Sequence, residues 1–130
     1  MSETIPYAMI KETAAVVGEA IQEIPKAGLV LGSGLGDLAQ LVESPRIVPY
    51  QRLPHWPQST VAGHSGQLVI GKLFGCEVLI QQGRAHYYEG WSMAEVTLPV
   101  RVMNVLGINT IVLTNAAGAI HPDYTPGDVM

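Results

Sequence analysis

The chain has 130 residues, which is enough for one domain with one hydrophobic core. Hydrophobic residues make up 48% of it and charged residues only 14%, a composition that excludes a disordered tail. The formal net charge of −4 excludes a basic surface that would attract nucleic acid or an acidic membrane. Any bound anion must therefore be held by a local group of donors.

Targeting and metal-binding signals are weak throughout the sequence. The N-terminus lacks a basic segment followed by an apolar stretch, and no apolar run approaches the roughly 18 residues of a membrane span. The single cysteine, Cys76, cannot form an internal disulfide and is expected to be packed and inert. The histidines show no ligand spacing, so no metal site is expected. These features predict a soluble, cytoplasmic protein without a membrane segment.

The first half of the chain predicts a helix, a strand and a loop-rich stretch. Apolar residues recur at helical spacing from Ile10 to Ile24, and Pro25 should end that helix. Residues 28–31 form a short apolar run typical of a buried strand, which leads into a glycine-rich turn and a second helix beginning near Asp37. Residues 45–65 contain four prolines and are expected to be mostly loop.

The second half predicts a strand pair, a helix and a last strand. Residues 67–80 suggest two strands around a turn at Phe74 and Gly75. The segment from Ser92 to Glu95 matches a capping box, and the helix that it opens can close at Gly107. Residues 110–113 form another buried strand.

Strands that alternate with helices predict an α/β fold with a mixed, largely parallel central sheet flanked by helices. The final residues, Val129 and Met130, resemble the start of a further strand after the turn at Pro126. We therefore expect residues 1–130 to be the N-terminal part of a single domain, with a sheet that is incomplete at the C-terminal end. Apolar strands left uncovered on that scale predict that the chain is not a self-sufficient monomer.

A glycine-rich segment, Gly32 to Gly36, lies between the first predicted strand and the following helix. Glycines allow the backbone to approach a ligand, and a helix N-terminus offers free N–H donors to an anion. Ser33 adds a hydroxyl donor at the same place. The segment matches neither the dinucleotide-binding pattern nor a P-loop, so taken alone it also fits a tight turn without a ligand.

A second group of polar side chains, Arg84, His86 and Tyr88, follows the predicted strand pair. In an extended segment these residues alternate and face the same side. The arginine supplies a fork of donors suited to oxyanions, and the histidine adds a donor that can be charged or neutral. The alternative is a group of exposed side chains without a ligand, but the chain has only seven lysines and arginines, which favours a function.

Two further segments complete the candidate site. His64 lies between glycines in a loop, where a histidine is either solvated or used as a ligand-binding group. The small residues from Asn115 to Gly118 follow the last predicted strand and could support a flat ligand. Ligands of parallel sheets bind at the carboxyl ends of strands, where Ser33 and Arg84 are also predicted to lie.

These segments together resemble the trimeric-type purine nucleoside phosphorylases, also called inosine–guanosine phosphorylases. The segments that carry the resemblance are LVLGSGLG (29–36), STVAGHSGQLVIG (59–71), GRAHYYEG (83–90), PVRVMNVLG (99–107) and TNAAGAIHPDYTPGDVM (114–130). The resemblance implies a phosphorylase-type fold, a homotrimer and reversible phosphorolysis of purine nucleosides to free base and ribose 1-phosphate. It implies phosphate as a co-substrate and no cofactor or metal.

The resemblance also implies a role for individual residues. Phosphate would be held by Ser33, His64, Arg84, His86 and the backbone N–H of Ala116, and His86 would be the catalytic group of this chain. The nucleoside would contact Tyr88, Asn115, Ala117 and Gly118. The residues that read the purine would lie beyond Met130. A phosphate- or nucleoside-binding module without catalysis, or a fragment without a ligand, are the alternatives.

Overall fold

The computed structural model describes residues 4–58 and 66–130. The described residues form two α-helices, five strands and three short 3-10 helices, in an order that alternates between helical and extended segments. The α-helices are α1 (Tyr7–Gly18) and α2 (Met93–Val105), and the strands are β1 (Ala27–Val30), β2 (Glu43–Pro49), β3 (Gln67–Leu73), β4 (Cys76–Gln82) and β5 (Ile111–Leu113). The 3-10 helices span Gly36–Leu41, Tyr50–Arg52 and Tyr87–Glu89.

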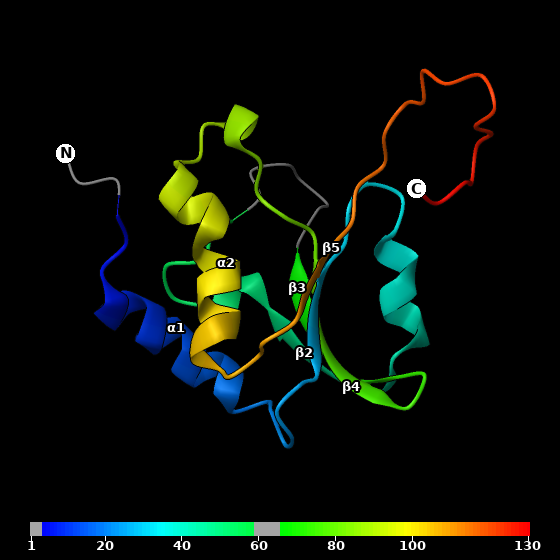
Figure 1. Cartoon of the computed structure of the whole chain (residues 1–130). Helices are drawn as coiled ribbons and strands as arrows, with labels where there is room; N and C mark the ends of the chain where they lie inside the picture. Colours follow the sequence, from blue (N-terminus) through cyan, green and yellow to red (C-terminus); the bar gives the residue numbers. More distant parts are fainter. Residues whose placement is uncertain (1–3, 59–65) are drawn as a thin grey trace.

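The five strands form one mixed sheet in the order β2-β3-β4-β1-β5. Strand β1 is parallel to both of its neighbours, β4 and β5, whereas β3 is antiparallel to both of its neighbours, β2 and β4. The structure therefore confirms the α/β fold with a mixed sheet, in which half of the pairings are parallel. Because β4, β1 and β5 run in the same direction, their carboxyl ends meet at one edge of the sheet, as Figure 1 shows.

Apolar side chains cover both faces of the sheet and form two clusters. Helices α1 and α2 pack side by side on one face, and the 3-10 helix Gly36–Leu41 covers the other (Figure 1). The cluster under the α-helices includes Ile10, Val17, Leu68, Ile70, Leu79, Leu98 and Val102. The opposite cluster consists of Leu31, Ala39, Val42, Val69, Leu73, Val78 and Ile80. Neighbouring strand residues thus alternate between the two clusters, as the period of a strand requires.

Helix α2 begins and ends as its sequence predicts. The Ser92 hydroxyl accepts a hydrogen bond from the backbone N–H of Glu95 at 3.3 Å, and the Glu95 carboxylate accepts one from the Ser92 N–H at 2.8 Å. This reciprocal capping satisfies two donors that a helix start would otherwise leave unpaired. Gly107 follows the last turn with a φ of 85°, which is the usual left-handed position beyond a helix C-terminus.

Three predicted elements differ from the observed ones. Helix α1 ends at Gly18 and not at Pro25, because the chain leaves the helix through a turn in which Ile21 N–H donates to Gly18 at 3.1 Å. The predicted helix near Asp37 is a 3-10 helix. The stretch expected to be mostly loop contains β2, an edge strand that tolerates prolines because only one of its sides is paired.

The hairpin of β3 and β4 turns at Phe74 and Gly75, as predicted, with positive φ angles of 50° and 81° at these two residues. Cys76 follows this turn and is exposed, so the expectation of a packed thiol is wrong. It pairs with Leu73 at the very end of the hairpin, directly after the turn. Neither of the two α-helices in the described residues is long and apolar enough to cross a membrane.

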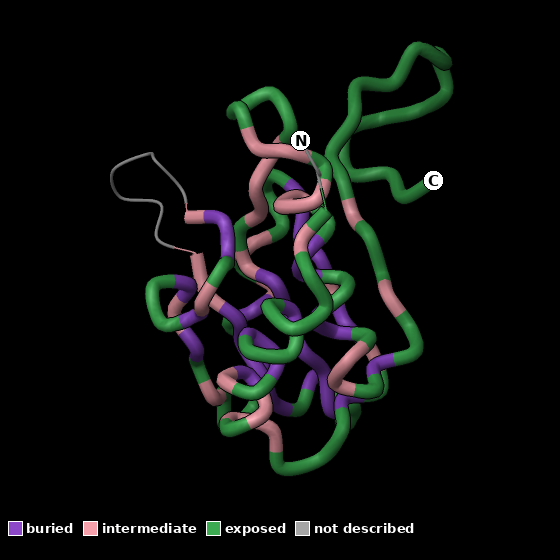
Figure 2. Tube along the Cα trace, turned by 90° about the vertical axis from the view of Figure 1, so that its left-hand side faces the viewer, coloured by how far each residue is buried: buried purple, intermediate pink, exposed green. Residues whose placement is uncertain are grey.

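The chain after β5 extends away from the sheet. Residues 115–130 contain no helix or strand and are exposed along their whole length, as the uniform green of this segment in Figure 2 shows. The buried residues lie instead in the centre of the sheet and under the α-helices. Only residues close to the start of this segment can therefore contribute to a site at the sheet edge.

Candidate active site

Two of the predicted polar segments meet at the carboxyl ends of β1 and β4. Ser33 follows β1 after a short turn, and Arg84 follows β4 after a single glycine. The two strands are paired in parallel from Ala27 with Val78 to Val30 with Gln81, which brings both segments to the same edge of the sheet. Convergence at strand ends, which was predicted from the sequence, is thus observed for these two segments.

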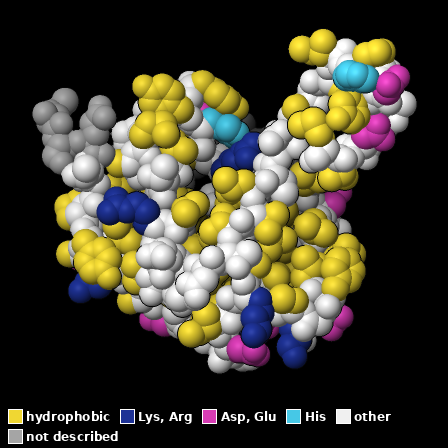
Figure 3. All heavy atoms as spheres, in the orientation of Figure 1, with side chains coloured by type: hydrophobic (Ala, Val, Ile, Leu, Met, Phe, Trp, Pro, Cys, Tyr) yellow, Lys and Arg dark blue, Asp and Glu magenta, His cyan; other side chains and the backbone are white. Residues whose placement is uncertain are grey.

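A cleft of about 420 Å³ opens between these segments. Its lining includes the predicted site residues Ser33, Arg84, His86 and Tyr88. The other residues that line it are Leu31, Gly32, Gly34, Gly36, Tyr50, Pro57, Gly66, Gly83, Ala85, Glu89 and Trp91. In Figure 3 a histidine lies beside a basic side chain in a hollow at the upper edge of the molecule. The volume suits a small polar ligand such as an oxyanion with a sugar.

Arg84 is fixed by two hydrogen bonds at the edge of this cleft. Its Nε donates to His86 Nε2 at 3.4 Å, and its Nη1 donates to the backbone carbonyl of Thr114 at 3.0 Å. The second terminal nitrogen, Nη2, has no partner within residues 4–58 and 66–130. Because Arg84 is the only lysine or arginine among the lining residues, it is the main source of positive potential in the cleft.

His86 lies between Arg84 and an acidic side chain. The Glu89 carboxylate accepts a hydrogen bond from the His86 backbone N–H at 2.7 Å and lies 3.2 Å from His86 Nδ1. Since the guanidinium of Arg84 can only donate, His86 Nε2 accepts from it and the imidazole proton belongs on Nδ1, facing Glu89. The His86 ring also stacks on Tyr88, with ring centroids 4.8 Å apart and planes inclined by 20°.

Ser33 lies in a turn that requires a glycine before it. A Cβ atom at Gly32 would lie 2.7 Å from the carbonyl oxygen of Thr114 and 2.8 Å from Asn115 Cα, which are both backbone atoms that cannot move aside cheaply. The absent side chain lets the glycine-rich turn lie directly against the end of β5. Ser33 itself is exposed at the mouth of the cleft.

Thr114 connects the segments around the cleft, although sequence reasoning did not assign it a role. Its hydroxyl accepts from the Gly32 N–H at 2.8 Å and donates to the Val30 carbonyl at 2.9 Å, while its own carbonyl accepts from Arg84. One residue thus joins the ends of β1 and β5 to the guanidinium. Its position directly after a predicted parallel strand was the only signal that could have indicated it.

Glu89 and Tyr50 are the other site residues that the sequence analysis missed. Glu89 follows His86 at the capping-box spacing of three residues, a signal that is present in the sequence. Tyr50 lies more than thirty residues before Arg84, and its hydroxyl donates to the Gly83 carbonyl at 2.5 Å. No local pattern indicates such a long-range contact.

The remaining predicted site residues do not line the cleft in the described structure. His64 falls in the stretch 59–65, outside the described residues. Asn115, Ala116, Ala117 and Gly118 are exposed and follow Thr114 away from the sheet. The Cα of Asn115 lies close to Gly32, which lines the cleft. Their ligand contacts remain predictions.

The described residues also contain no group of three or more His, Cys, Asp or Glu side chains that could hold a metal ion. The cleft instead offers a guanidinium, an imidazole, a hydroxyl and aromatic rings. Donors of this kind, placed at the ends of parallel strands, suit the binding of an oxyanion next to a ring-shaped group.

Comparison with known proteins agrees with this geometry. The model of the phosphorylase superfamily matches residues 26–130. The chain is 50% identical over 121 residues to purine nucleoside phosphorylase 1 of Bacillus subtilis, which covers 93% of this chain and 45% of that protein. It is 42% identical over 130 residues to the purine nucleoside phosphorylase of Rattus norvegicus, covering 100% of this chain and 45% of that protein.

Solved structures show the same relationship. A crystal structure of Schistosoma mansoni purine nucleoside phosphorylase in complex with inosine superposes with a TM-score of 0.85 at 38% identity, over 98% of this chain and 44% of that one. Another, of a purine nucleoside phosphorylase in complex with ribose-1-phosphate, gives a TM-score of 0.87 at 40% identity, over 98% of this chain and 46% of that one. The chain thus spans less than half the length of these relatives. With the family model matching most of its length and the fold shared throughout, the chain belongs to the phosphorylase superfamily.

Proposed function

We propose that this chain supplies the phosphate- and ribose-binding part of the active site of a purine nucleoside phosphorylase of the inosine and guanosine class. The observation that carries the proposal is the convergence of Ser33, Arg84 and His86 on one cleft at the ends of parallel strands. The names of the relatives, and the nucleoside and sugar phosphate in the similar crystal structures, support the substrate class.

In this proposal phosphate occupies the part of the cleft beside Arg84. Arg84 Nη2, which has no partner among residues 4–58 and 66–130, and the Ser33 hydroxyl donate to its oxygens, in a charge-assisted hydrogen bond where the donor is the guanidinium. His86 Nε2, which carries no proton, accepts from the hydroxyl of the protonated phosphate. His64 and the backbone N–H of Ala116 are proposed as further phosphate ligands. The ribose lies against Tyr88, with Asn115, Ala117 and Gly118 on the side of the sugar and base.

The proposed reaction is a displacement at the sugar carbon that carries the base. The bond from that carbon to the purine nitrogen breaks and its electron pair leaves with the base, while a phosphate oxygen forms the new bond. His86 takes at Nε2 the proton that phosphate loses, because Nδ1 is already held by Glu89. The departing base takes a proton from water, and His86 returns its proton to water, so that no proton is gained or lost overall. Catalysis then rests on positioning and on stabilisation of the positively charged, oxocarbenium-like sugar. Phosphate is the co-substrate, and neither a cofactor nor a metal takes part.

We further propose that residues 1–130 form the N-terminal part of one phosphorylase domain and that the whole protein is a cytoplasmic homotrimer. Support comes from the coverage of less than half of each relative and from apolar side chains that are exposed on and after β5. Leu113 is 69% exposed, and Ile120 and Val129 are almost completely exposed to solvent. Further chain packed on this edge would bury them.

The test is an assay of the whole protein with inosine and phosphate. We expect release of hypoxanthine that depends on phosphate, together with formation of ribose 1-phosphate, which ³¹P NMR distinguishes from free phosphate. Omission of phosphate is the control and should abolish turnover. Formation of free ribose, or binding of phosphate without any turnover, would contradict the phosphorylase and favour a hydrolase or a binding module.

Tyr88 provides a test of the ribose-facing side of the cleft. Its ring stacks on His86, whereas its hydroxyl has no partner among residues 4–58 and 66–130. We expect Tyr88→Phe to change kcat/KM for inosine less than about threefold and Tyr88→Ala to lower it by about tenfold or more, because ring packing is what the truncation removes. Steady-state kinetics of both variants decide the matter. A large loss in Tyr88→Phe would show that the substrate uses the hydroxyl instead.

A further inference from the structure

Tyr50 is a buried tyrosine in the wall of the cleft that has no part in the proposed chemistry. It follows the last residue of β2 and is 4% exposed. Its ring packs on Trp56, with centroids 5.1 Å apart, and fills the space where a side chain at Gly66 would lie. Both features fix the ring in one place.

Hydrogen bonds connect Tyr50 to three other segments of the chain. Its hydroxyl donates to the Gly83 carbonyl at 2.5 Å, and its backbone N–H donates to the Gly66 carbonyl at 3.1 Å. Its own carbonyl accepts from the Gln58 side chain at 2.7 Å. Two of these partners, Gly66 and Gly83, also line the cleft. The residue thus joins the end of β2 to the start of β3 and the end of β4.

The bond to Gly83 matters for the residue that follows it. Gly83 has a φ of 94°, a conformation that a glycine adopts without strain. Because a glycine can adopt many other conformations as easily, contacts with other residues must hold it in this one. Arg84 is the next residue in the chain. A change in the backbone angles of Gly83 would therefore move the Arg84 guanidinium away from the Thr114 carbonyl. A fixed carbonyl at Gly83 therefore fixes the direction in which Arg84 leaves β4.

We infer that Tyr50 is a positioning residue of the anion site, which holds Arg84 in its binding orientation by anchoring the Gly83 carbonyl. The inference rests on the proposed function, because it assigns Arg84 to phosphate. Burial raises the pKa of the Tyr50 phenol above its ordinary value, so the hydroxyl stays protonated and remains a donor throughout the working pH range. Its hold on Gly83 does not vary with pH.

The test is Tyr50→Phe in the whole protein, which removes the hydroxyl and keeps the ring against Trp56 and Gly66. We expect the KM for phosphate to rise about five- to tenfold, as for the loss of one buried hydrogen bond, with the KM for inosine changed less than about twofold. The turnover number at saturating phosphate should stay close to wild type. Tyr7→Phe, on an exposed tyrosine of α1, is the matched control and should change neither constant.

A second variant tests the same contact by changing Gly83, the residue whose carbonyl accepts the hydrogen bond from Tyr50. Gly83→Ala keeps Tyr50 but disfavours the φ that presents the carbonyl, and it should reproduce the phosphate-specific loss. If Tyr50→Phe does not fold, Gly83→Ala still tests whether the Gly83 carbonyl positions Arg84.

The outcomes separate the two proposals. A wild-type protein that binds no phosphate would overturn the proposed function and this inference with it. A wild type that binds phosphate, with both variants unchanged in phosphate KM, would overturn the role of Tyr50 alone. Equal rises in the KM for phosphate and for inosine would show a merely structural residue and would also overturn it.

Discussion

Replacement of Arg84 by alanine is expected to raise the KM for phosphate about a hundredfold, since one or two charge-assisted hydrogen bonds worth about 3 kcal/mol together are lost. Arg84 is the only basic side chain among the lining residues, so nothing else in the described wall of the cleft can replace its charge. The affinity for inosine in the absence of phosphate should change less than about threefold. Separate titrations with phosphate and with nucleoside measure the two effects.

Two further variants make this prediction specific. Arg84→Lys keeps the charge but loses the planar fork that binds both His86 and Thr114, and its phosphate KM should fall between those of wild type and Arg84→Ala. Arg101→Ala removes an exposed arginine of α2 and should leave both affinities unchanged. Equal losses of phosphate and nucleoside affinity in Arg84→Ala would mean that the assigned role is wrong.

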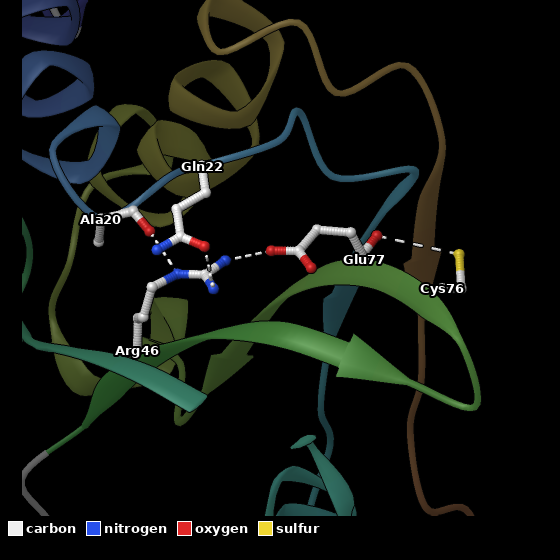
Figure 4. A network of polar contacts seen from close by, with 5 residues as sticks. All are labelled: Ala20, Gln22, Arg46, Cys76 and Glu77. Atoms are coloured by element: carbon white, nitrogen blue, oxygen red, sulfur yellow. Dashed lines mark hydrogen bonds and ion pairs between the residues drawn. The ribbon is translucent and has the colours of Figure 1, made fainter. Parts of the chain in front are cut away.

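The second large effect is expected away from the cleft, at the ion pair of Arg46 and Glu77. Figure 4 shows the guanidinium of Arg46, a residue of β2, directed at the Glu77 carboxylate of β4. The guanidinium also donates to the Ala20 carbonyl at 2.7 Å and to the Gln22 side chain at 3.4 Å. The Glu77 side chain is only 5% exposed. Arg46→Met leaves this carboxylate buried without a counter-charge, which should lower the free energy of unfolding by about 3 kcal/mol.

Chemical denaturation of the whole protein measures this loss. A double variant, Arg46→Met with Glu77→Leu, removes both charges and should recover most of the lost stability, because the cost arises from the unpaired carboxylate. Arg52→Met, on an exposed arginine, is the matched control and should stay within about 0.5 kcal/mol of wild type. If the single variant Arg46→Met were as stable as this control, the ion pair would contribute nothing measurable.

Local patterns predicted those elements whose stability is itself local. The hairpin turn at Phe74 and Gly75 and the capping box at Ser92 involve neighbours in sequence, and both are observed. Strand β2 was missed because Pro45 and Pro49 suggest a loop. The structure accommodates Pro45 at a register shift between Glu43 and Arg46, at the edge of the sheet, where no partner strand needs its missing N–H.

The end of α1 shows how a correct pattern can give a wrong boundary. Ile21 continues the apolar spacing of the helix, and it does pack against the core, but from a turn. The Ala20 carbonyl in that turn binds Arg46, which lies far away in the sequence. Apolar periodicity records which residues are buried, and here it continues into a turn that lies beyond the end of the helix.

The residues of the candidate site also fall into two groups, those that a local sequence pattern predicted and those that only long-range contacts bring to the site. The alternation of Arg84, His86 and Tyr88 predicted that they face one side, and the Arg84–His86 contact and the His86–Tyr88 stacking agree with this. The extended segment expected there was wrong for Tyr88, which lies in the 3-10 helix Tyr87–Glu89. Thr114 and Tyr50, which hold Arg84 in place directly or through Gly83, could not be predicted because their contacts arise only when separate strands meet. Sequence motifs therefore indicated the groups that face the ligand more readily than those that support them.

The order of strands in the sheet also has a consequence for the time course of folding. Strands β3 and β4 are joined by a two-residue turn, so their pairing requires closure of a very short loop and can form within microseconds. By contrast, β1 pairs with β5 through residues as distant in sequence as Gly28 and Ile111, which demands a far larger loss of chain entropy. The cleft needs both kinds of pairing, since Arg84 follows the hairpin and its partner Thr114 follows β5. The anion site should thus be among the last parts of the molecule to assemble, on a hairpin that has formed long before it.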